Sequence, residues 1–301
     1  MQFVFWWIKW LVFFVEFGLR QSLRSITPFQ RAKSNASIVF NSGKTMQTIE
    51  DILTSVDGWL HPKEARLLYR LASECRGRGA IVEIGSWKGK STICLARGSL
   101  AGGKAKINAI DPHTGSPEHA REIGVVWTFD EFRRNIEKSG MNDMVTPHVD
   151  YSDAVARKFD EPVELIFIDG LHEYEGVKID FDDWFPKVID HGHMAFHDST
   201  CWPGVLKCVS EDVFKSRRFR KVRFAKSIVH GEKVAQNTFF ERVENRIMLW
   251  AFLIHAFKDR WQWRLLHNYL DFPITRSLIA YFKKRQVKPV PMSAEKPARA
   301  S

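Results

Sequence analysis

The stretch from residue 80 to residue 111 constrains the fold more than any other part of the chain. It opens with a short apolar run that contains one acid, Glu83, and then passes through Gly85 and Gly89 into a segment with helical periodicity. A second apolar run stops at Asp111. This order predicts a strand, a glycine turn, a helix and a second parallel strand. Because the tip of the second strand then lies beside the turn, the stretch predicts a nucleoside site, with the carboxylate on the ribose.

Spacing separates three kinds of nucleoside-binding loop. A dinucleotide-binding fold needs G-x-G-x-x-G, whereas this turn has two glycines four positions apart, Gly85 and Gly89. A Walker A loop needs G-x-x-x-x-G-K-S, and the segment that ends in Lys90 and Ser91 is one residue short for wrapping a phosphate. A P-loop-like nucleotide-binding enzyme therefore stays as a minor alternative.

The turn resembles the first motif of the class I S-adenosylmethionine-dependent methyltransferases. The form E-x-G-x-x-x-G-x-S is similar to that of the catechol O-methyltransferase branch and its bacterial relatives. The resemblance covers residues from about 57 to 233, and it implies a doubly wound, mostly parallel, Rossmann-like α/β sheet. It also implies that S-adenosylmethionine binds with its ribose on Asp111 and its amino acid end on Glu83 and Gly85. The other cofactor-binding residues that it implies in this motif are Ser86, Gly89 and Ser91. The alternative for Glu83 is a strand-end acid that caps neighbouring amides.

A third strand is expected at residues 145–149, and polar residues follow it. The family places contacts to the adenine end of the cofactor at this point, so the resemblance implies that Ser152 and Asp153 bind the base. For Asp153, capping of a helix is an equally good interpretation.

Two later apolar runs each end in an acid. Residues 163–168 stop at Asp169, and residues 193–196 stop at His197 and Asp198. If both runs are parallel strands of one sheet, their carboxyl ends share an edge and the two carboxylates converge there. Two carboxylates at one point repel each other unless a cation or a proton lies between them, and a hard divalent ion, Mg²⁺ above all, satisfies both.

Catechol O-methyltransferase-like enzymes hold a divalent metal with an aspartate after the fourth strand and two residues after the fifth. The resemblance therefore implies Asp169, Asp198 and His197 as ligands, although an imidazole at this place departs from the family pattern. His172 falls where the family has its catalytic base, so together with Asp169 it is the predicted catalytic pair. The I-D-G-x-H-x-Y segment and the H-D pair followed by W-P-G-V are similar to bacterial small-molecule and sugar O-methyltransferases.

The charge is unevenly distributed along the chain. Of the 301 residues, positions 1–46 carry six basic residues and one acid, and positions 215–301 carry 20 basic residues and six acids, so the part between them is acidic. An enzyme of nucleic acids places its positive field around the active site, so nucleic acid is not an expected partner. The basic ends suit an anionic surface. Four cysteines without metal-finger or CxxC spacing indicate reduced thiols in a cytoplasmic protein.

Both ends of the chain are rich in aromatic residues. Residues 1–19 form the most apolar stretch, in which Gln2, Lys9 and Glu16 make a narrow polar seam on a helix. Spanning a bilayer would cost about 2.5–3.5 kcal/mol for Lys9, so the helix is expected to lie in the interface of the inner face of a membrane, with packing on protein or on a second subunit as the alternative. Residues 239–270 show a second helical pattern that is aromatic and basic, so the two segments are expected to pack together or to lie side by side on the membrane, which gives peripheral contact through both ends of the chain. A homodimer is a further expectation.

The predicted organisation has four parts. An amphipathic segment and linker occupy residues 1–47, the methyltransferase domain 48–234, a helical amphipathic extension 235–282 and a disordered basic tail 283–301. The resemblance implies metal-assisted O-methylation of a small molecule or a sugar hydroxyl. A non-catalytic membrane-associated binding module is the remaining alternative. Within the domain, further helices are expected at 48–60, 62–75, 129–139, 177–188 and 203–214, and a closing hairpin at 219–229.

Overall fold

The computed structural model describes residues 48–115 and 126–270, with side chains as far as residue 258. The predicted segment 1–47, the basic tail and part of the polar loop that follows Asp111 lie outside the described residues. The described residues from 49 onward form one compact unit.

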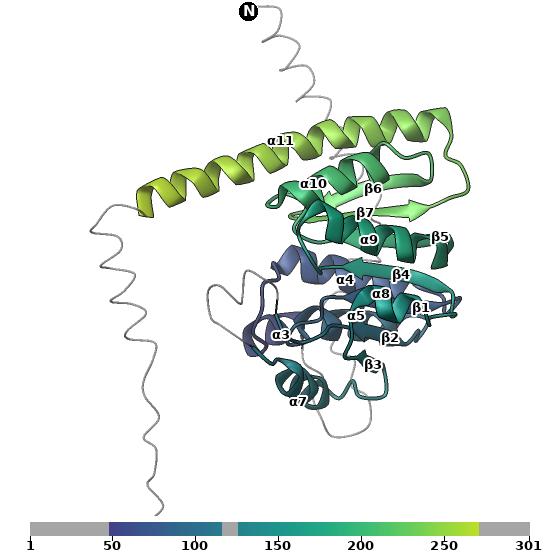
Figure 1. Cartoon of the computed structure of the whole chain (residues 1–301), viewed down its shortest axis with the longest axis vertical. Helices are drawn as coiled ribbons and strands as arrows, with labels where there is room; N and C mark the ends of the chain where they lie inside the picture. Colours follow the sequence, from purple (N-terminus) through teal and green to yellow (C-terminus); the bar gives the residue numbers. More distant parts are fainter. Residues whose placement is uncertain (1–47, 116–125, 271–301) are drawn as a thin grey trace, which may run out of the picture. The chain divides into compact units, whose positions relative to one another are not determined.

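A seven-stranded sheet forms the centre of this unit (Figure 1). Its order is β3-β2-β1-β4-β5-β7-β6, in which β3 to β5 are parallel and β7 is antiparallel to both of its neighbours. The order reverses between β1 and β4, and in such sheets ligands bind outside the carboxyl ends at that point. The strands are β1 (Ala80–Ile84), β2 (Ile107–Ile110), β3 (Val145–His148), β4 (Val163–Ile168), β5 (Val188–Phe196), β6 (Phe219–Ala225) and β7 (Ile228–Lys233).

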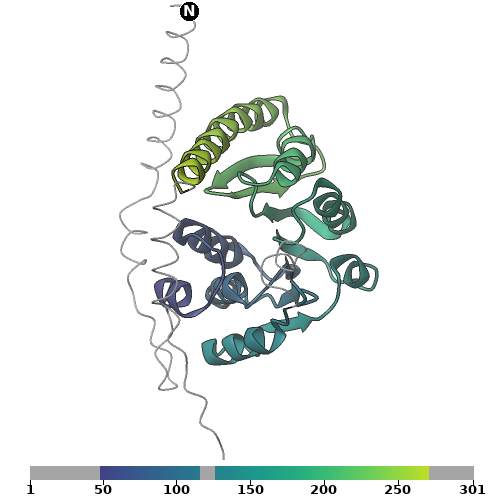
Figure 2. The same ribbon diagram turned by 60° about the vertical axis from the view of Figure 1, so that its left-hand side comes forward.

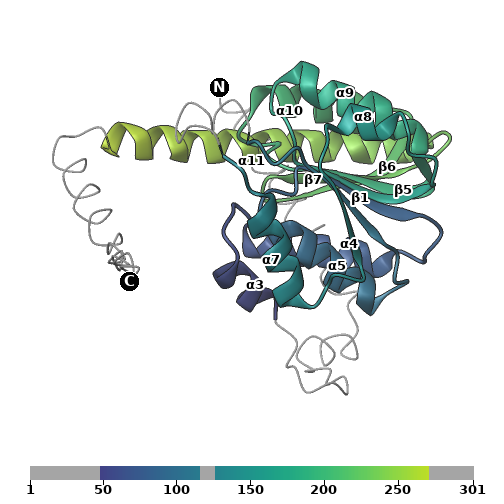
Figure 3. The same cartoon turned by 60° about the horizontal axis from the view of Figure 1, so that its bottom comes forward.

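Helices cover both faces of the sheet (Figures 2 and 3). The strands β1, β2 and β4 are buried at every position, as expected for parallel strands between two helical layers. One layer packs a core of its own with α3 (Ile49–Ser55), α4 (Pro62–Glu74), α5 (Lys90–Ala101) and α7 (Phe129–Ser139). The other layer packs with α8 (Ser152–Ala156), α9 (Tyr174–Trp184), α10 (Pro203–Cys208), the π-helical turn η3 (Val209–Phe214) and α11 (Phe239–Leu270). The predicted doubly wound α/β fold is confirmed.

The register of the strands fixes the edge at which they end. Ile84 pairs with Ile110 on one side and with Ile168 on the other, and Ile168 pairs with Phe196. The residues that follow β1, β2, β4 and β5 therefore lie along one edge of the sheet. This is the geometry on which the predicted site depends.

One predicted helix differs from the structure at both ends. Residues 177–188 were expected to be helical, but α9 begins at Tyr174 and ends at Trp184. Pro186 follows within a short 3-10 turn, η2 (Phe185–Lys187), because a proline disfavours continuation of the α-helix at the residue before it. Val188 already belongs to β5. The helix predicted at 48–60 is also shorter, since α3 ends at Ser55.

The helix α11 packs on the sheet and is not a separate extension. Leu249 and Phe252 lie in the same core as β6 and η3, and the fully buried Asn245 accepts a hydrogen bond from the Val222 amide and donates one to the Phe219 carbonyl. The predicted boundary at residue 234 therefore does not separate two units. Within the described ranges, none of the helices combines the length and the apolar content that crossing a bilayer requires.

Candidate active site

The glycine turn after β1 lies against the ends of both neighbouring strands. Gly85 has a φ of +83°, and its amide donates to the Ile110 carbonyl at 2.9 Å. A Cβ atom at this position would lie 2.0 Å from the carbonyl oxygen of Asp169. Only glycine fits here, because the backbone is left-handed and the space of a side chain is already filled by the chain that leaves β4.

Asp111 lies beside this turn. Its carboxylate accepts hydrogen bonds from the Trp87 amide at 2.7 Å and from the His113 amide at 2.6 Å. Each oxygen keeps a further lone pair, and the side chain is only partly buried. The acid and the turn therefore form one cradle, as the β-α-β pattern predicts.

The side chain of Glu83 is buried beneath the cradle. One of its oxygens accepts a hydrogen bond from the Thr92 hydroxyl on α5, and burial raises the pKa of this carboxyl to about 8. Its other oxygen, Oε1, and the Oγ atom of Ser86 are buried without a hydrogen-bond partner among the described residues. Buried polar atoms in native proteins are nearly always paired, so these two atoms point to a ligand at the turn.

The rest of the predicted motif lies in the first turn of α5. Gly89 caps the helix with a φ of +90°, and Ser91 is buried behind it. Lys90 donates to the carbonyls of Leu53 and Gly58 at 3.2 and 2.8 Å. In a Walker A loop this lysine would reach the phosphates, so its engagement elsewhere argues against the P-loop alternative.

The predicted adenine contacts both have partners within the protein. The Ser152 hydroxyl donates to Asp180, a buried acid on α9 whose pKa is raised to about 6 by burial. Asp153 stands in the first turn of α8 and pairs with Arg157 at 2.8 Å. A carboxylate in a first helical turn is stabilising, so the alternative role of Asp153 at the helix end accounts for its position. No role was predicted for Asp180.

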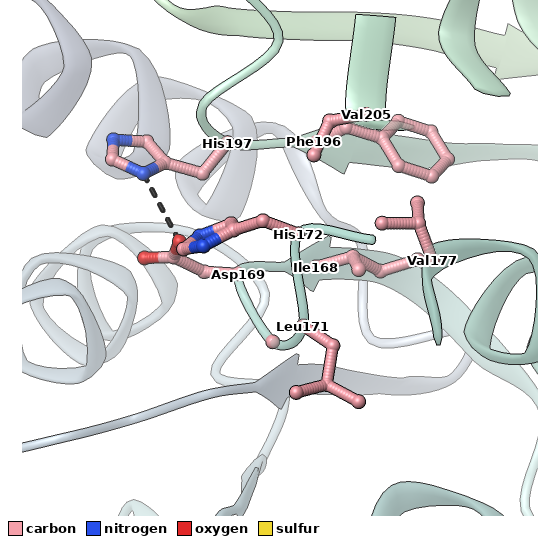
Figure 4. A pocket seen from close by; sticks show the side chains of 9 residues that line it. Ile168, Asp169, Leu171, His172, Val177, Phe196, His197 and Val205 are labelled. Carbon is pink, nitrogen blue, oxygen red and sulfur yellow. Dashed lines mark hydrogen bonds and ion pairs between the residues drawn. The ribbon is translucent and has the colours of Figure 1, made fainter. Parts of the chain in front are cut away.

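The two acids that follow β4 and β5 come together around His197. Figure 4 shows the Asp169 carboxylate pointing toward this ring. The ring of His197 is buried, with Nδ1 3.0 Å from Asp169 Oδ1 and 3.5 Å from Asp198 Oδ2. Its Nε2 atom lies 3.4 Å from Glu64 Oε2. His172 approaches from the loop after β4, with Nε2 3.3 Å from Asp198 Oδ2. Asp169, His172 and His197 also line a small pocket, together with Ile168, Gly170, Leu171, Val177, Phe196 and Val205.

The carboxylates determine the charge of His197. Burial disfavours its charged form, but the neighbouring Asp169, Asp198 and Glu64 outweigh burial and hold the pKa of the imidazole well above its ordinary value. Burial also opposes the charge of Asp198, yet hydrogen bonds from His172 and His197 hold the pKa of this carboxyl well below its usual range. His197 therefore serves the site as a buried cation.

The candidate metal ligands form a group of three. Asp169, His172 and Asp198 each offer a ligand atom, and these atoms lie within 4.8 Å of one another. His197 lies beside this group, and its ring nitrogens face Asp169 and Glu64. The structure thus brings His172 to the predicted ligands Asp169 and Asp198.

Glu64 is the member of the site for which the sequence predicts no role. It lies on α4, is buried, and accepts hydrogen bonds from the amide and hydroxyl of Ser227 at 2.8 and 2.7 Å. Its other oxygen accepts from the amide of His61, which completes a capping box at the start of α4. The capping box is a local signal for the helix start. The approach to His197, 133 residues away, has no local signal.

The matches to known proteins agree with this geometry. Residues 82–199 match a family model described as a methyltransferase domain. The chain therefore carries a methyltransferase domain over these residues, which include the glycine turn, Asp111 and the acid pair.

Individual relatives of the methyltransferase domain are distant. A protein of Sinorhizobium fredii, described as uncharacterized protein y4gI, is 30% identical over 120 residues, which cover 40% of this chain and 13% of that protein. The solved structure of the O-methyltransferase NovP has a TM-score of 0.51 at 18% identity, over 57% of this chain and 80% of that one. An O-methyltransferase from Bacillus cereus has a TM-score of 0.46 at 20% identity, over 67% and 97% of the two chains. The likeness to NovP supports the fold.

Proposed function

We propose that the methyltransferase domain transfers a methyl group from S-adenosylmethionine to a hydroxyl oxygen of a small molecule or a sugar, with a divalent metal ion at the acid pair. The observation that carries this proposal is the convergence of Asp169, His172 and Asp198 at the carboxyl edge of the sheet, beside the cofactor cradle. Gly85 connects the two, because its backbone touches the Asp169 carbonyl. The methyl donor and the acceptor hydroxyl would then meet at the same edge.

The cradle fits the cofactor through particular atoms. The open lone pairs of Asp111 suit the ribose hydroxyls. The unpartnered oxygen of Glu83 and the hydroxyl of Ser86 suit the amino acid end, since a bound ammonium group would give a buried carboxylate the partner that it lacks. Ser152 and Asp153 remain the proposed neighbours of the base.

The acid edge fits a metal ion through its donors. Two carboxylate oxygens suit Mg²⁺ or Mn²⁺, and the imidazole shifts the preference toward Mn²⁺ or another transition metal. A divalent ion there supplies positive charge that lowers the pKa of a nearby hydroxyl. The His197 ring faces Oδ1 of Asp169, so Oδ2 of the same carboxylate would hold the ion.

His172 has two roles that exclude each other. Its ring stacks on Trp202, with centroids 4.6 Å apart, and its Nε2 atom faces Asp198. The same nitrogen can ligate the metal or accept the proton of the substrate hydroxyl, but it has one lone pair for both. His172→Ala separates these roles, because loss of the base removes turnover and keeps metal affinity, whereas loss of a ligand weakens both.

The test begins with binding and not with an acceptor. S-adenosylhomocysteine should bind the purified chain, and Asp111→Ala should weaken that binding, whereas ATP with Mg²⁺ should not raise the unfolding temperature. Mn²⁺ binding, followed by electron paramagnetic resonance, should be lost in Asp169→Asn and Asp198→Asn. The exposed Asp150→Asn is the matched control. Unchanged Mn²⁺ binding in both site variants would remove the metal from the proposal and leave methyl transfer standing.

Peripheral membrane contact is proposed for residues 1–19, on their apolar aromatic composition and the basic residues that follow them. Full-length chain should co-sediment with vesicles that contain anionic lipid, and a chain that starts at residue 48 should not. Equal co-sedimentation of both would contradict this part of the proposal.

A further inference from the structure

The face of α11 that points away from the sheet is apolar along its described length. Its exposed side chains recur at alternating intervals of three and four residues, and each is between 41% and 82% exposed. This set is called the α11 stripe, and its members are Phe240, Val243, Ile247, Trp250, Ile254 and Phe257. Figures 1 and 3 show α11 lying along the outside of the sheet, next to β6.

A helix that is apolar on opposite faces has two partners. The first partner of α11 is the sheet, which buries Leu249 and Phe252. On the other face, Phe240, Trp250 and Phe257 are 82%, 66% and 65% exposed. At 150–250 Å² for each aromatic side chain, these three leave roughly 400 Å² of apolar surface in water. With the aliphatic members added, the α11 stripe is as large as the patches that mark interaction sites.

We propose that the α11 stripe pairs in antiparallel orientation with the α11 stripe of a second copy of this chain. Alternation of three and four residues is the spacing of a coiled-coil seam, which is narrower than the apolar face of a helix that lies on a lipid surface or a domain. In one antiparallel register, each apolar side chain of one copy contacts one of the other copy: Phe240 contacts Phe257, Val243 contacts Ile254, and Ile247 contacts Trp250. Each of these three contacts occurs twice because the pair of helices is two-fold symmetric. No member of the stripe is left without a partner in this register.

The charges beside the stripe fit the same register. Glu244 and Lys258 occupy equivalent heptad positions next to the seam, two heptads apart. The antiparallel register that fills the apolar layers places Glu244 of one copy opposite Lys258 of the other, and it does so twice. Ala251, midway between them, faces its own counterpart at the two-fold axis. A small residue at that point lets the helices approach closely.

The area is sufficient for a dimer that uses the neighbouring side chains as well. A standard interface buries about 800 Å² on each partner, and the exposed aromatic rings of the α11 stripe supply roughly half of this. The stripe spans about 25 Å along the helix, so the aliphatic members and the flanking residues are expected to supply the remaining buried area.

A lipid surface fits the stripe less well. Helices that lie in a membrane interface carry lysine and arginine along the polar boundary. The boundary of the α11 stripe is mixed, with Glu244 and Lys258 on one side and Arg246 and Leu253 on the other. A carboxylate at this boundary would face the anionic headgroups, whereas in the pair of helices it meets a lysine.

Sedimentation equilibrium of the full-length chain at micromolar concentrations tests the proposal. We expect a dimer, and we expect Ile247→Glu to raise its dissociation constant at least about 30-fold, the effect of losing a central contact. The matched control is Ile179→Glu on α9, because Ile179 is 52% exposed and Ile247 is 55% exposed. Unfolding temperatures of both variants near that of the parent chain verify that they fold.

A charge exchange tests the register. Lys258→Glu should weaken the dimer by opposing two carboxylates, and adding Glu244→Lys should recover most of the loss, although the second change also removes the ion pair of Glu244 with Arg223. A monomeric parent chain, or a dimer that Ile247→Glu leaves intact, would overturn the proposal. A monomer whose co-sedimentation with anionic vesicles is lost in Ile247→Glu would also overturn it, and would assign the stripe to lipid.

Discussion

Replacement of Gly85 by alanine tests whether the cofactor cradle and the acid edge share one piece of backbone. A Cβ atom at Gly85 meets the Asp169 carbonyl oxygen at 2.0 Å and its carbonyl carbon at 2.6 Å, and the φ is +83°. The left-handed backbone costs about 1–2 kcal/mol for alanine, and forcing the two strand ends apart costs about 1–3 kcal/mol more. We therefore expect a loss of about 2–5 kcal/mol in the free energy of unfolding.

The chain offers a matched control in Gly140, which ends α7. Its φ is +70°, but a Cβ atom there meets nothing within 4 Å. Gly140→Ala should therefore show the backbone cost alone, about 1–2 kcal/mol. At roughly 2–4 °C per kcal/mol for a domain of this size, the unfolding temperature should fall on the order of 10 °C for Gly85→Ala and about 4 °C for the control.

The assay is thermal unfolding of both variants with and without S-adenosylhomocysteine. The Gly140→Ala protein should keep the full stabilisation by the ligand, because Gly140 lies outside the cradle. The Gly85→Ala protein should lose most of it, since the displaced turn carries the Trp87 amide away from Asp111. Equal temperature shifts in the two variants, with ligand stabilisation kept in both, would refute the argument that the turn and the Asp169 backbone are in contact.

Two further predictions concern buried carboxylates. Glu64→Gln should lower the free energy of unfolding by about 2–4 kcal/mol in urea titrations, because the amide cannot accept all the hydrogen bonds of the carboxylate and leaves His197 without one of its counter-charges. The control is the exposed Glu74→Gln, which should change the free energy of unfolding by less than about 0.5 kcal/mol. Equal losses in the two variants would contradict the role of Glu64. Burial opposes the charge of Glu232, but Arg220, His191 and Lys221 outweigh burial and lower its pKa from 4.5 to about 2. The stability that this carboxylate confers is therefore complete above pH 4.5 and is lost as the pH falls toward 2. In a Glu232→Gln variant, the free energy of unfolding should fall less steeply between these pH values than in the parent chain. An equally steep fall in both proteins would contradict this role of Glu232.

The parts of the site that follow from the sequence are those fixed by strand order. Each carboxylate of the candidate edge comes directly after a buried apolar run, so a parallel sheet brings Asp111, Asp169 and Asp198 to one side without further information. The glycine turn follows for the same reason. Because strand pairing determines backbone position, these predictions did not depend on side-chain packing.

The parts that do not follow depend on packing between distant segments. Glu64 reaches His197 from α4, and this contact helps to hold the imidazole as a buried cation. The sequence also does not show which face of α11 packs on the sheet, because the neighbours Leu249 and Trp250 are both large apolar side chains, yet Leu249 is buried and Trp250 is 66% exposed. A periodic pattern shows that a helix has apolar faces, and only the sheet determines which face it covers.

The charge balance of the acid edge leads to a last prediction. Three carboxylates, those of Glu64, Asp169 and Asp198, surround one imidazolium at His197, so the edge carries an excess of negative charge that a divalent ion would offset. His197→Asn removes the internal cation and keeps a donor for Asp169, which increases that excess. We expect the variant to be less stable than the parent chain without metal, because its buried carboxylates have lost their counter-charge. We also expect Mn²⁺ to raise its unfolding temperature by more than it raises that of the parent, since a bound ion stabilises the folded state by mass action and now restores a missing charge. A smaller Mn²⁺ shift in His197→Asn than in the parent would mean that His197 holds the ion or its ligands in place, and would contradict its role as the counter-charge of the site.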